Sequence, residues 1–251
     1  MKIALFGGTF DPVHEGHLAV ARAAVKRFAL DRVYFVPADL PPHKQGVEMA
    51  DYCHRFAMLA LATIAEDRFV PSLLEAGNAS ARKPNYSIHT VRRLKSALQE
   101  SDKLYFLIGI DAFMDIAKWK HPVELLSECN FIVVSRPGYS LTNVIEALPE
   151  AVRPSDELLK SLSPWHASRM VPLPSKTIYL LDKVEEEISS TQVRQAARKS
   201  VKQLSRFVPR LVAEYIKKEH LYGSGMPSSE SENEDEKRPK VLSFRRERPS
   251  D

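Results

Sequence analysis

Several short runs of this chain are apolar at nearly every position, instead of at every second one as in a strand with one wet face. The runs lie at residues 2–6, 33–36, 104–108, 131–134 and 178–181, with a shorter candidate at 69–74. Between them, segments 18–28, 50–64 and 87–98 carry apolar residues at helical spacing. Strands that are buried on both faces and separated by helices are typical of a parallel sheet covered on both sides. The sequence therefore predicts an α/β fold built on one such sheet.

The same pattern predicts where a ligand would lie, because ligands of open parallel sheets bind beyond the carboxyl ends of the strands. The residues that close or follow four of the predicted strands, and are expected on one common rim, are Gly7, Pro37, Gly109 and Ser135. One stretch departs from the pattern. Residues 149–175 are rich in proline and show little periodicity, so we expect an irregular excursion between the last two strands, with a short helix at 156–162.

The first strand runs into the most informative segment of the chain, Gly7-Gly8-Thr9-Phe10-Asp11-Pro12-Val13-His14-Glu15-Gly16-His17, and a helical pattern follows from Leu18. Glycines at a strand end let backbone N–H groups turn toward one point, and a helix N-terminus there adds positive partial charge. His14 and His17 are three residues apart and can reach the same face, and Gly16 lets a ligand approach the backbone. The segment predicts a phosphate site built from N–H groups and imidazoles.

A second segment, Ile188-Ser189-Ser190-Thr191-Gln192-Val193-Arg194, opens a helix late in the chain. Capping of that helix would explain one hydroxyl, but it does not explain three in a row followed by an arginine. Hydroxyls and free N–H groups at a helix start, together with a guanidinium that can bind two oxygens, suit a polyphosphate. The segment therefore predicts a second set of phosphate ligands: Ser190, Thr191 and Arg194.

Together the two segments resemble the two signatures of the HxGH nucleotidyltransferase superfamily, the second of which, ISSTxxR, occurs here without a departure. Members of this superfamily join a nucleoside monophosphate to an acceptor phosphate and release pyrophosphate. The resemblance implies an α/β fold of the nucleotidyltransferase (HxGH) type, with a Rossmann-like parallel sheet and helices on both faces.

Further motifs narrow the resemblance. They are Pro41-Pro42-His43-Lys44, Ile108-Gly109-Ile110-Asp111, Trp119 and Arg136-Pro137-Gly138. Together they are similar to the bacterial nicotinate-nucleotide adenylyltransferase family, and the similarity runs from residue 1 to about residue 222. The chain departs from that family at Asn85-Tyr86-Ser87-Ile88-His89-Thr90-Val91, where the family commonly has Ser-Tyr-Thr-x-(Asp or Gln)-Thr-Leu. Ser87 and His89 are therefore expected to alter the geometry of the acceptor pocket.

The resemblance also implies an activity and the residues that perform it. It implies an enzyme of NAD biosynthesis that joins the AMP part of ATP to nicotinate mononucleotide, giving deamido-NAD and pyrophosphate, with His14, His17 and Arg194 as catalytic residues. The residues implied to bind ATP are Gly7, Gly8, Thr9, Phe10, His14, His17, Gly109, Asp111, Ser190, Thr191 and Arg194. Those implied to bind the acceptor are His43, Lys44, Tyr86, Ser87, Asp111 and Trp119. No residue is assigned to a metal, and Mg²⁺ is expected to arrive with ATP.

Two other acceptors and one non-catalytic role stay open at this point. Phosphopantetheine adenylyltransferases share the first signature, and nicotinamide mononucleotide differs from nicotinate mononucleotide by one charge. A non-catalytic nucleotide-binding or scaffold protein is the third alternative, against which the intact His14, His17 and Arg194 argue.

Composition limits the remaining classes of protein. With 251 residues, 44% of them hydrophobic, the chain can bury one substantial core. The net charge is +4, and basic residues are scattered before residue 237, so nucleic acid is not an expected partner. Cys53 and Cys129 match no metal spacing and suit buried thiols in a reducing compartment, and no run is long enough to cross a membrane. We expect a cytoplasmic enzyme with one domain at 1–222, a disordered charged tail at 223–251, and an oligomeric state that the sequence leaves open.

Overall fold

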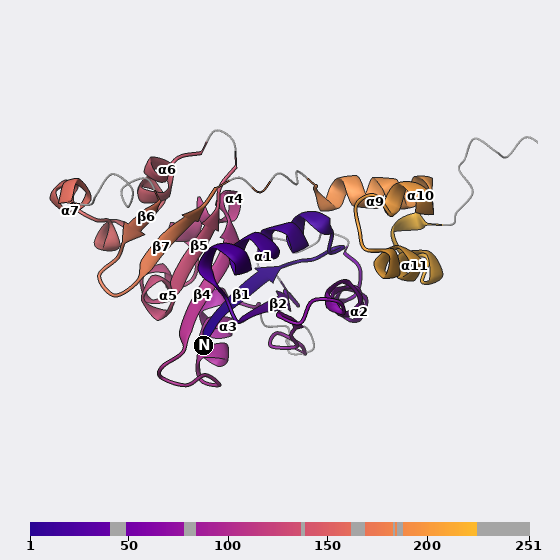
Figure 1. The fold of residues 1–251 in the computed structure, drawn as a ribbon, viewed down its shortest axis with the longest axis horizontal. Helices are drawn as coiled ribbons and strands as arrows, with labels where there is room; N and C mark the ends of the chain where they lie inside the picture. Colours follow the sequence, from indigo (N-terminus) through magenta and orange to yellow (C-terminus); the bar gives the residue numbers. More distant parts are fainter. Residues whose placement is uncertain are drawn as a thin grey trace, which may run out of the picture.

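A computed structural model describes residues 1–40, 49–77, 84–136, 139–161, 169–182, 184 and 188–224. Within those residues the strands form one seven-stranded sheet with the order β3-β2-β1-β4-β5-β7-β6 (Figure 1). The strands are β1 (Lys2–Gly8), β2 (Arg32–Pro37), β3 (Phe69–Pro71), β4 (Lys103–Gly109), β5 (Asn130–Val134), β6 (Met170–Pro172) and β7 (Thr177–Leu181). All neighbouring pairs are parallel except β6 with β7, so the expected parallel sheet is confirmed for six of the seven strands.

Helices connect the strands and cover the sheet. The α-helices are α1 (Glu15–Phe28), α2 (Tyr52–Thr63), α3 (Ser87–Lys95), α4 (Ile110–Phe113), α5 (Pro122–Glu128), α6 (Leu141–Glu146), α7 (Asp156–Ser161), α9 (Ser190–Lys199), α10 (Val201–Leu204) and α11 (Arg210–Lys218). Short 3₁₀ turns occur at η2 (Ile116–Lys118), η3 (Glu150–Val152) and η4 (Leu221–Gly223). The predicted alternation of strands and helices is therefore present.

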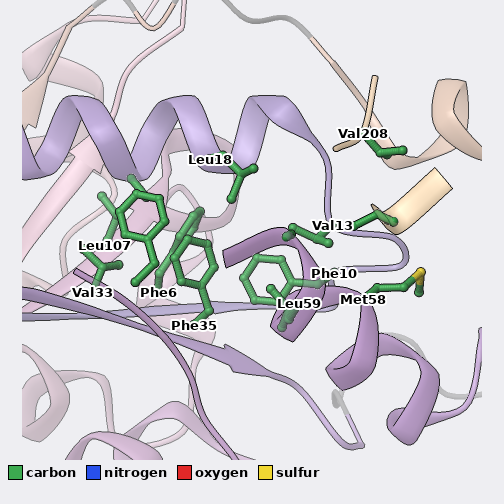
Figure 2. Close-up of a cluster of buried hydrophobic side chains, with 14 of the residues drawn as sticks. Phe6, Phe10, Val13, Leu18, Val33, Phe35, Met58, Leu59, Leu107 and Val208 are labelled. Carbon is green, nitrogen blue, oxygen red and sulfur yellow. The ribbon is translucent and has the colours of Figure 1, made fainter. Parts of the chain in front are cut away.

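The two faces of the sheet bury two separate clusters of apolar side chains. Ala4 and Phe6 of β1 belong to the cluster that includes residues of α1 and α11, here called the α1 core, part of which Figure 2 shows. Ile3 and Leu5 belong to the cluster that includes residues of α3 and α5, here called the α3 core. Successive side chains of a strand point to opposite faces, so a strand between two cores must be apolar at every position. This arrangement explains the continuous apolar runs in the sequence.

The strand order reverses between β1 and β4. These two strands are neighbours in the sheet, although β2 and β3 lie between them in the sequence. From β1 the chain passes to β2 and β3 on one side, and from β4 to β5 and β7 on the other (Figure 1). Gly8 is in register with Pro37, and Gly109 with Val134, so the expected common rim is confirmed. Ligands of such sheets bind where the order reverses, which places the candidate site beyond the carboxyl ends of β1 and β4.

Two expectations from the sequence need correction, one about the edge of the sheet and one about a cysteine. The stretch 149–175 is not wholly irregular, because β6 pairs antiparallel with β7 inside it. The strand has three residues and ends in Pro172, which suits only an edge position, and so short a segment gives no periodic signal. The short helix expected there is present as α7. Cys129 is buried as expected, but Cys53 is exposed on α2.

The last three helices form a separate group at the end of the molecule where α1 begins (Figure 1). Val193 of α9, Leu204 of α10 and Val212 of α11 are buried in the α1 core. The backbone N–H of Glu15, the first residue of α1, donates to the Phe207 carbonyl oxygen at 2.8 Å. These contacts hold the C-terminal helices against the loop between β1 and α1. The expected tail lies outside the described residues from residue 225 on.

Candidate active site

The loop that follows β1 does not turn at its glycines. Gly7 and Gly8 continue β1, and the left-handed backbone lies at Phe10, with φ of 49°. The Phe10 ring is buried and packs edge-on against Phe6 at 5.6 Å between ring centroids. A Cβ at Gly8 would lie 3.1 Å from the Phe10 ring. Glycine is therefore needed at position 8 for this close approach, and burial of the Phe10 ring offsets its unfavourable φ.

Helix α1 begins earlier than the sequence pattern indicates, and its first turn contains both histidines. His14 is the extended N-cap residue, with φ of −147°, and its carbonyl oxygen accepts from the backbone N–H groups of His17 and Leu18 at 2.9 and 3.3 Å. The His14 and His17 rings lie face to face with a tilt of 30°, and their centroids are 3.7 Å apart. The predicted meeting of the two imidazoles is thus confirmed. It results from a helix that begins at Glu15 instead of Leu18.

The hydrogen bond between the two histidines fixes the tautomer of one of them. The His14 backbone N–H donates to His17 Nδ1 at 3.2 Å. Because Nδ1 must carry a lone pair to accept this bond, the neutral imidazole of His17 carries its proton on Nε2. His14 Nδ1 is buried and has no hydrogen-bond partner among the described residues. The pair therefore keeps a ring N–H donor on His17 and leaves a polar atom of His14 unsatisfied.

Burial makes both imidazoles weakly basic. Desolvation lowers the pKa of His14 from 6.5 to about 4. Desolvation also lowers the pKa of His17 well below 6.5, and repulsion from His14 lowers it further. Two stacked imidazoles would repel each other if both were charged. Both rings are therefore neutral at neutral pH.

The start of α9 lies against the same loop. Ser189 is the N-cap, and its Oγ accepts from the Gln192 backbone N–H at 3.3 Å. Of the three consecutive hydroxyls, one is thus used for capping, and Ser190 and Thr191 lie in the first turn, where backbone N–H groups have no partner within the helix. Ser190 Oγ donates to the Pro12 carbonyl oxygen at 3.4 Å. The second predicted segment therefore meets the first.

Arg194 of α9 connects to the loop more strongly. Its Nη1 donates to the Asp11 carbonyl oxygen at 2.7 Å and lies 3.9 Å from Asp11 Oδ2. Its Nη2 donates to Thr191 Oγ1 at 3.3 Å. The guanidinium, Thr191 and the loop are therefore placed together, as the sequence predicts.

The sequence analysis missed a buried arginine that supports this loop from below. Arg55 of α2 is 2% exposed, and it donates to the carbonyl oxygens of Thr9, Ala38 and Ala50 at 2.7–2.9 Å. It thereby joins the ends of β1 and β2 to the start of α2. One signal could have found it, because Arg55 is the one Asp, Glu, Lys or Arg in the otherwise apolar helix α2.

The end of β4 carries the predicted residues Gly109 and Asp111. A Cβ at Gly109 would meet no atom within 4 Å, so the space there is open. Asp111 Oδ2 lies 2.8 Å from Arg136 Nη1, and both side chains are at least half exposed. Arg136 follows β5 and was not among the expected site residues. Trp119 is partly buried and packs edge-on against Phe106 at 6.2 Å.

Two of the residues expected to bind the acceptor, Tyr86 and Ser87, lie near this side of the site. Tyr86 is the N-cap residue of α3, and Ser87 is the first residue of that helix. Lys120, next to Trp119, places its Nζ 4.5 Å from the centroid of the Tyr86 ring. This contact brings the start of α3 beside the segment that follows β4. His43 and Lys44 lie outside the described residues.

The described parts of the chain contain no group of three or more His, Cys, Asp or Glu side chains arranged to hold a metal ion. None of their helices has the length and apolar character needed to cross a membrane.

Comparisons with known proteins agree with this architecture. A family model described as cytidylyltransferase-like matches residues 5–196. A protein of Solibacter usitatus named as a probable nicotinate-nucleotide adenylyltransferase is 39% identical over 222 residues, which are 88% of this chain and 100% of that protein. A protein of the same name from Desulfotalea psychrophila is 39% identical over 223 residues, covering 88% and 99% of the two chains.

The fold itself matches a solved structure of a more distant protein. The nicotinic acid mononucleotide adenylyltransferase of Plasmodium falciparum, complexed with NaAD, superposes with a TM-score of 0.63 at 19% identity. The match covers 89% of this chain and 98% of that one. The expected α/β fold of nucleotidyltransferase type is thereby confirmed.

Proposed function

Because the chain belongs to the cytidylyltransferase-like family and, among its members, to the nicotinate-nucleotide adenylyltransferases, we propose that it transfers the adenylyl group of ATP to nicotinate mononucleotide. The products are deamido-NAD and pyrophosphate. The protein is thus a nucleotidyltransferase of NAD biosynthesis.

One observation supports the assignment of the site: two sets of phosphate ligands meet on a single loop. His14 ends the loop as the N-cap of α1 and stacks on His17. Arg194 binds the Asp11 carbonyl oxygen of the same loop from the other side. Imidazole, guanidinium and hydroxyl donors, with the free N–H groups of a helix start, suit a triphosphate.

The reaction needs little covalent help from the protein. An oxygen of the acceptor phosphate forms a bond to the α-phosphorus of ATP, and the bond from that phosphorus to the oxygen bridging it to the β-phosphate breaks. The attacking oxygen is already ionised at neutral pH, so no general base or protein nucleophile is required. The enzyme must hold two anions in line and offset the charge that grows on the departing pyrophosphate.

We assign the catalytic part of this work to the two histidines and Arg194. The Nε2–H of His17 is a neutral donor for a phosphate oxygen, and His14 becomes a charged donor when its ring is protonated. A triphosphate beside the pair favours protonation, because a nearby negative charge raises the pKa of an imidazole. Arg194 adds a fixed positive charge for the β- and γ-phosphates, with Ser190 and Thr191 as hydroxyl donors.

The remaining contacts are assigned to the rim. The backbone of Gly7, Gly8, Thr9 and Phe10 borders the nucleotide, and only the backbone of Phe10 is available because its ring is buried. Asp111 and Gly109 are assigned to the ribose, and Trp119, Tyr86 and Ser87 to the nicotinate end of the acceptor. Mg²⁺ bound to the triphosphate would neutralise part of its charge, and it would be held by phosphate oxygens and water instead of by a protein cage.

The experiment that tests the proposal is pyrophosphate release from ATP with each of three acceptors: nicotinate mononucleotide, nicotinamide mononucleotide and phosphopantetheine. A site built for a carboxylate presents hydrogen-bond donors, and an amide leaves one of them mismatched. We expect kcat/KM to favour the acid over the amide by at least about 10²-fold, with no release for phosphopantetheine. Arg194→Ala, purified in parallel, controls for contaminating activity. The reverse preference, or no release with any acceptor, would refute the proposed function.

A further inference from the structure

Tyr222, near the end of the described chain, reaches the phosphate loop. Its hydroxyl donates to Asp11 Oδ1 at 2.7 Å, across 211 positions of sequence. Burial and the negative charge of Asp11 raise the pKa of Tyr222. The phenol therefore stays protonated and remains a donor at every pH at which the enzyme would work.

Asp11 links Tyr222 to the candidate site, because it belongs to the loop after β1 and also contacts Arg194. The residue is 4% exposed, and its Oδ1 also accepts from the Ala50 backbone N–H at 3.2 Å. Its Oδ2 faces Arg194, and its carbonyl oxygen accepts from the Arg194 guanidinium at 2.7 Å. A buried carboxylate needs such partners, and here they come from the segment just before α2, from α9 and from the C-terminal turn η4.

The backbone of Tyr222 is held in an unfavourable conformation to make the contact. Its φ is 59°, in the left-handed region that bulky residues rarely adopt. Arg198 of α9 donates its Nε to the Tyr222 carbonyl oxygen at 3.3 Å. Ser224 is buried, and its Oγ donates to the Ile216 carbonyl oxygen of α11 at 2.9 Å. The turn is thus fixed on both sides of Tyr222, as expected where surrounding structure maintains local strain.

We propose that Tyr222 is a positioning residue of the active site. Through Asp11 it holds the loop of residues 9–14 and the carbonyl oxygen that orients Arg194. The histidines and the guanidinium can then meet one triphosphate. The inference rests on the proposed function of that site, since it treats His14, His17 and Arg194 as the phosphate ligands.

Tyr222→Phe tests this role, because the ring stays and only the hydroxyl is lost. Removing a hydrogen bond to a buried carboxylate leaves that group partly unsatisfied, and we expect a loss of about tenfold in ATP affinity. Calorimetric titration with Mg-ATP measures the affinity, and steady-state assays measure whether the KM for ATP rises more than kcat falls. The melting temperature is recorded for the same samples.

Tyr215→Phe is the matched control. Tyr215 lies in α11 of the same C-terminal group, and its hydroxyl contacts His54 Nδ1 of α2 at 2.8 Å instead of Asp11. We expect the control to bind ATP and turn over like the unaltered protein. In combination with Asp11→Ala, which removes the acceptor of the Tyr222 hydroxyl, Tyr222→Phe should add little further loss of ATP affinity, because both changes break the same contact.

Two outcomes would overturn the proposal. One is unchanged ATP affinity and an unchanged KM in Tyr222→Phe. The other is a loss of activity that matches a fall in the fraction of folded protein, since this would show a merely structural role. Failure of the proposed function can be distinguished from failure of the Tyr222 proposal. Unaltered protein that binds ATP but releases no pyrophosphate would refute the proposed reaction. The effect of Tyr222→Phe on ATP affinity could still be measured in that case.

Discussion

His17 accepts the backbone N–H of His14 on its Nδ1, 3.2 Å away, while the two rings stack 3.7 Å apart. One imidazole thereby caps the first turn of α1 and keeps its only ring proton on Nε2. Nδ1 of His17 thus holds the fold of the loop, and Nε2 is the atom that the proposed function assigns to phosphate. A pair of substitutions can separate them.

His17→Asn keeps an acceptor near the position of Nδ1 but removes the Nε2–H donor. Loss of a donor that stabilises charge in the transition state typically costs about 10²–10³ in kcat. We expect His17→Asn and His17→Ala to lose kcat to this similar extent, while only His17→Ala also loses stability, by about 1 kcal/mol for the missing cap. Stopped-flow or steady-state assays and urea unfolding give the two quantities. Near-normal turnover in His17→Asn would contradict the assignment of Nε2.

The lowered pKa of His14 predicts a dependence of stability on pH. Between about 4 and 6.5 the unfolded chain binds more protons at this residue than the folded chain does. The free energy of unfolding should therefore rise with pH across this window and level off above it, by up to about 3 kcal/mol. Urea unfolding at a series of pH values measures the slope. His14→Gln should reduce the slope, with the remainder coming from His17, whose pKa is also lowered, and an equal slope in that variant would rule out His14 as a source.

The same shift predicts proton uptake when ATP binds. A triphosphate raises the pKa of a neighbouring imidazole, so the complex should carry more protons than the free components at pH 6–7. We expect the affinity for ATP to increase as pH falls from 8 to 6. Calorimetry in buffers of different ionisation enthalpy counts the protons, and His14→Gln is the control. A proton count of zero in the unaltered protein would show that neither imidazole is protonated in the complex and would contradict the assignment of His14 as a charged donor.

Arg55 is expected to be the residue of α2 that is most costly to change. Arg55→Lys keeps the charge, but one ammonium cannot reach the carbonyl oxygens of Thr9, Ala38 and Ala50 with the geometry of a guanidinium. Buried carbonyl groups left without donors cost about 1–3 kcal/mol each, so we expect a loss of several degrees in melting temperature and a raised KM for ATP. Arg68→Lys, which changes an arginine bound to a single carbonyl oxygen, that of Leu30, is the matched control. Equal losses of melting temperature in Arg55→Lys and Arg68→Lys would contradict the proposal that Arg55 supports the loop through its three carbonyl contacts.

The sequence was sufficient to predict the central sheet because its strands lie between two cores. Phe106 and Leu107 are adjacent in β4, yet they pack in opposite cores. Only a strand that is buried on both faces needs apolar residues at successive positions. It was also sufficient to pair His14 with His17, which are neighbours on one helical turn. The edge strand β6 was missed because three residues carry no periodicity.

The residues that hold the loop after β1 in place could not be predicted in the same way. Which carbonyl oxygens Arg55 binds depends on how the ends of β1, β2 and α2 converge in space. The hydrogen bond from Tyr222 to Asp11 joins residues near the two ends of the described chain. A local sequence pattern cannot predict a contact between residues so far apart in the sequence. The conformation of Phe10 likewise depends on the Phe6 and Phe35 rings that receive its side chain.

Asp111 offers a test that separates function from stability. Its ion pair with Arg136 lies between two exposed side chains, and such pairs contribute about 0–1 kcal/mol. We therefore expect Asp111→Asn to leave the melting temperature nearly unchanged while raising KM for nucleotide about tenfold through lost bonds to sugar hydroxyls. Asp115→Asn, which changes an exposed partner of Lys118, is the control. Unchanged KM in Asp111→Asn would remove this residue from the site.

The end of the catalytic domain can be located by truncation. The sequence predicts a limit at residue 222, but Ser224 is buried and bonded to Ile216, so we propose that the domain extends to residue 224. A chain that ends after Ser224 keeps the turn that holds Tyr222, and we expect its kcat, its KM for ATP and its melting temperature to match those of the full chain. A chain that ends after Leu221 loses the bond to Asp11 and both anchors of the turn. It should show a KM for ATP raised by at least about tenfold together with a lower melting temperature. If the chain that ends after Ser224 were already impaired, residues 225–251 would have a part in the enzyme that the expected charged tail does not have.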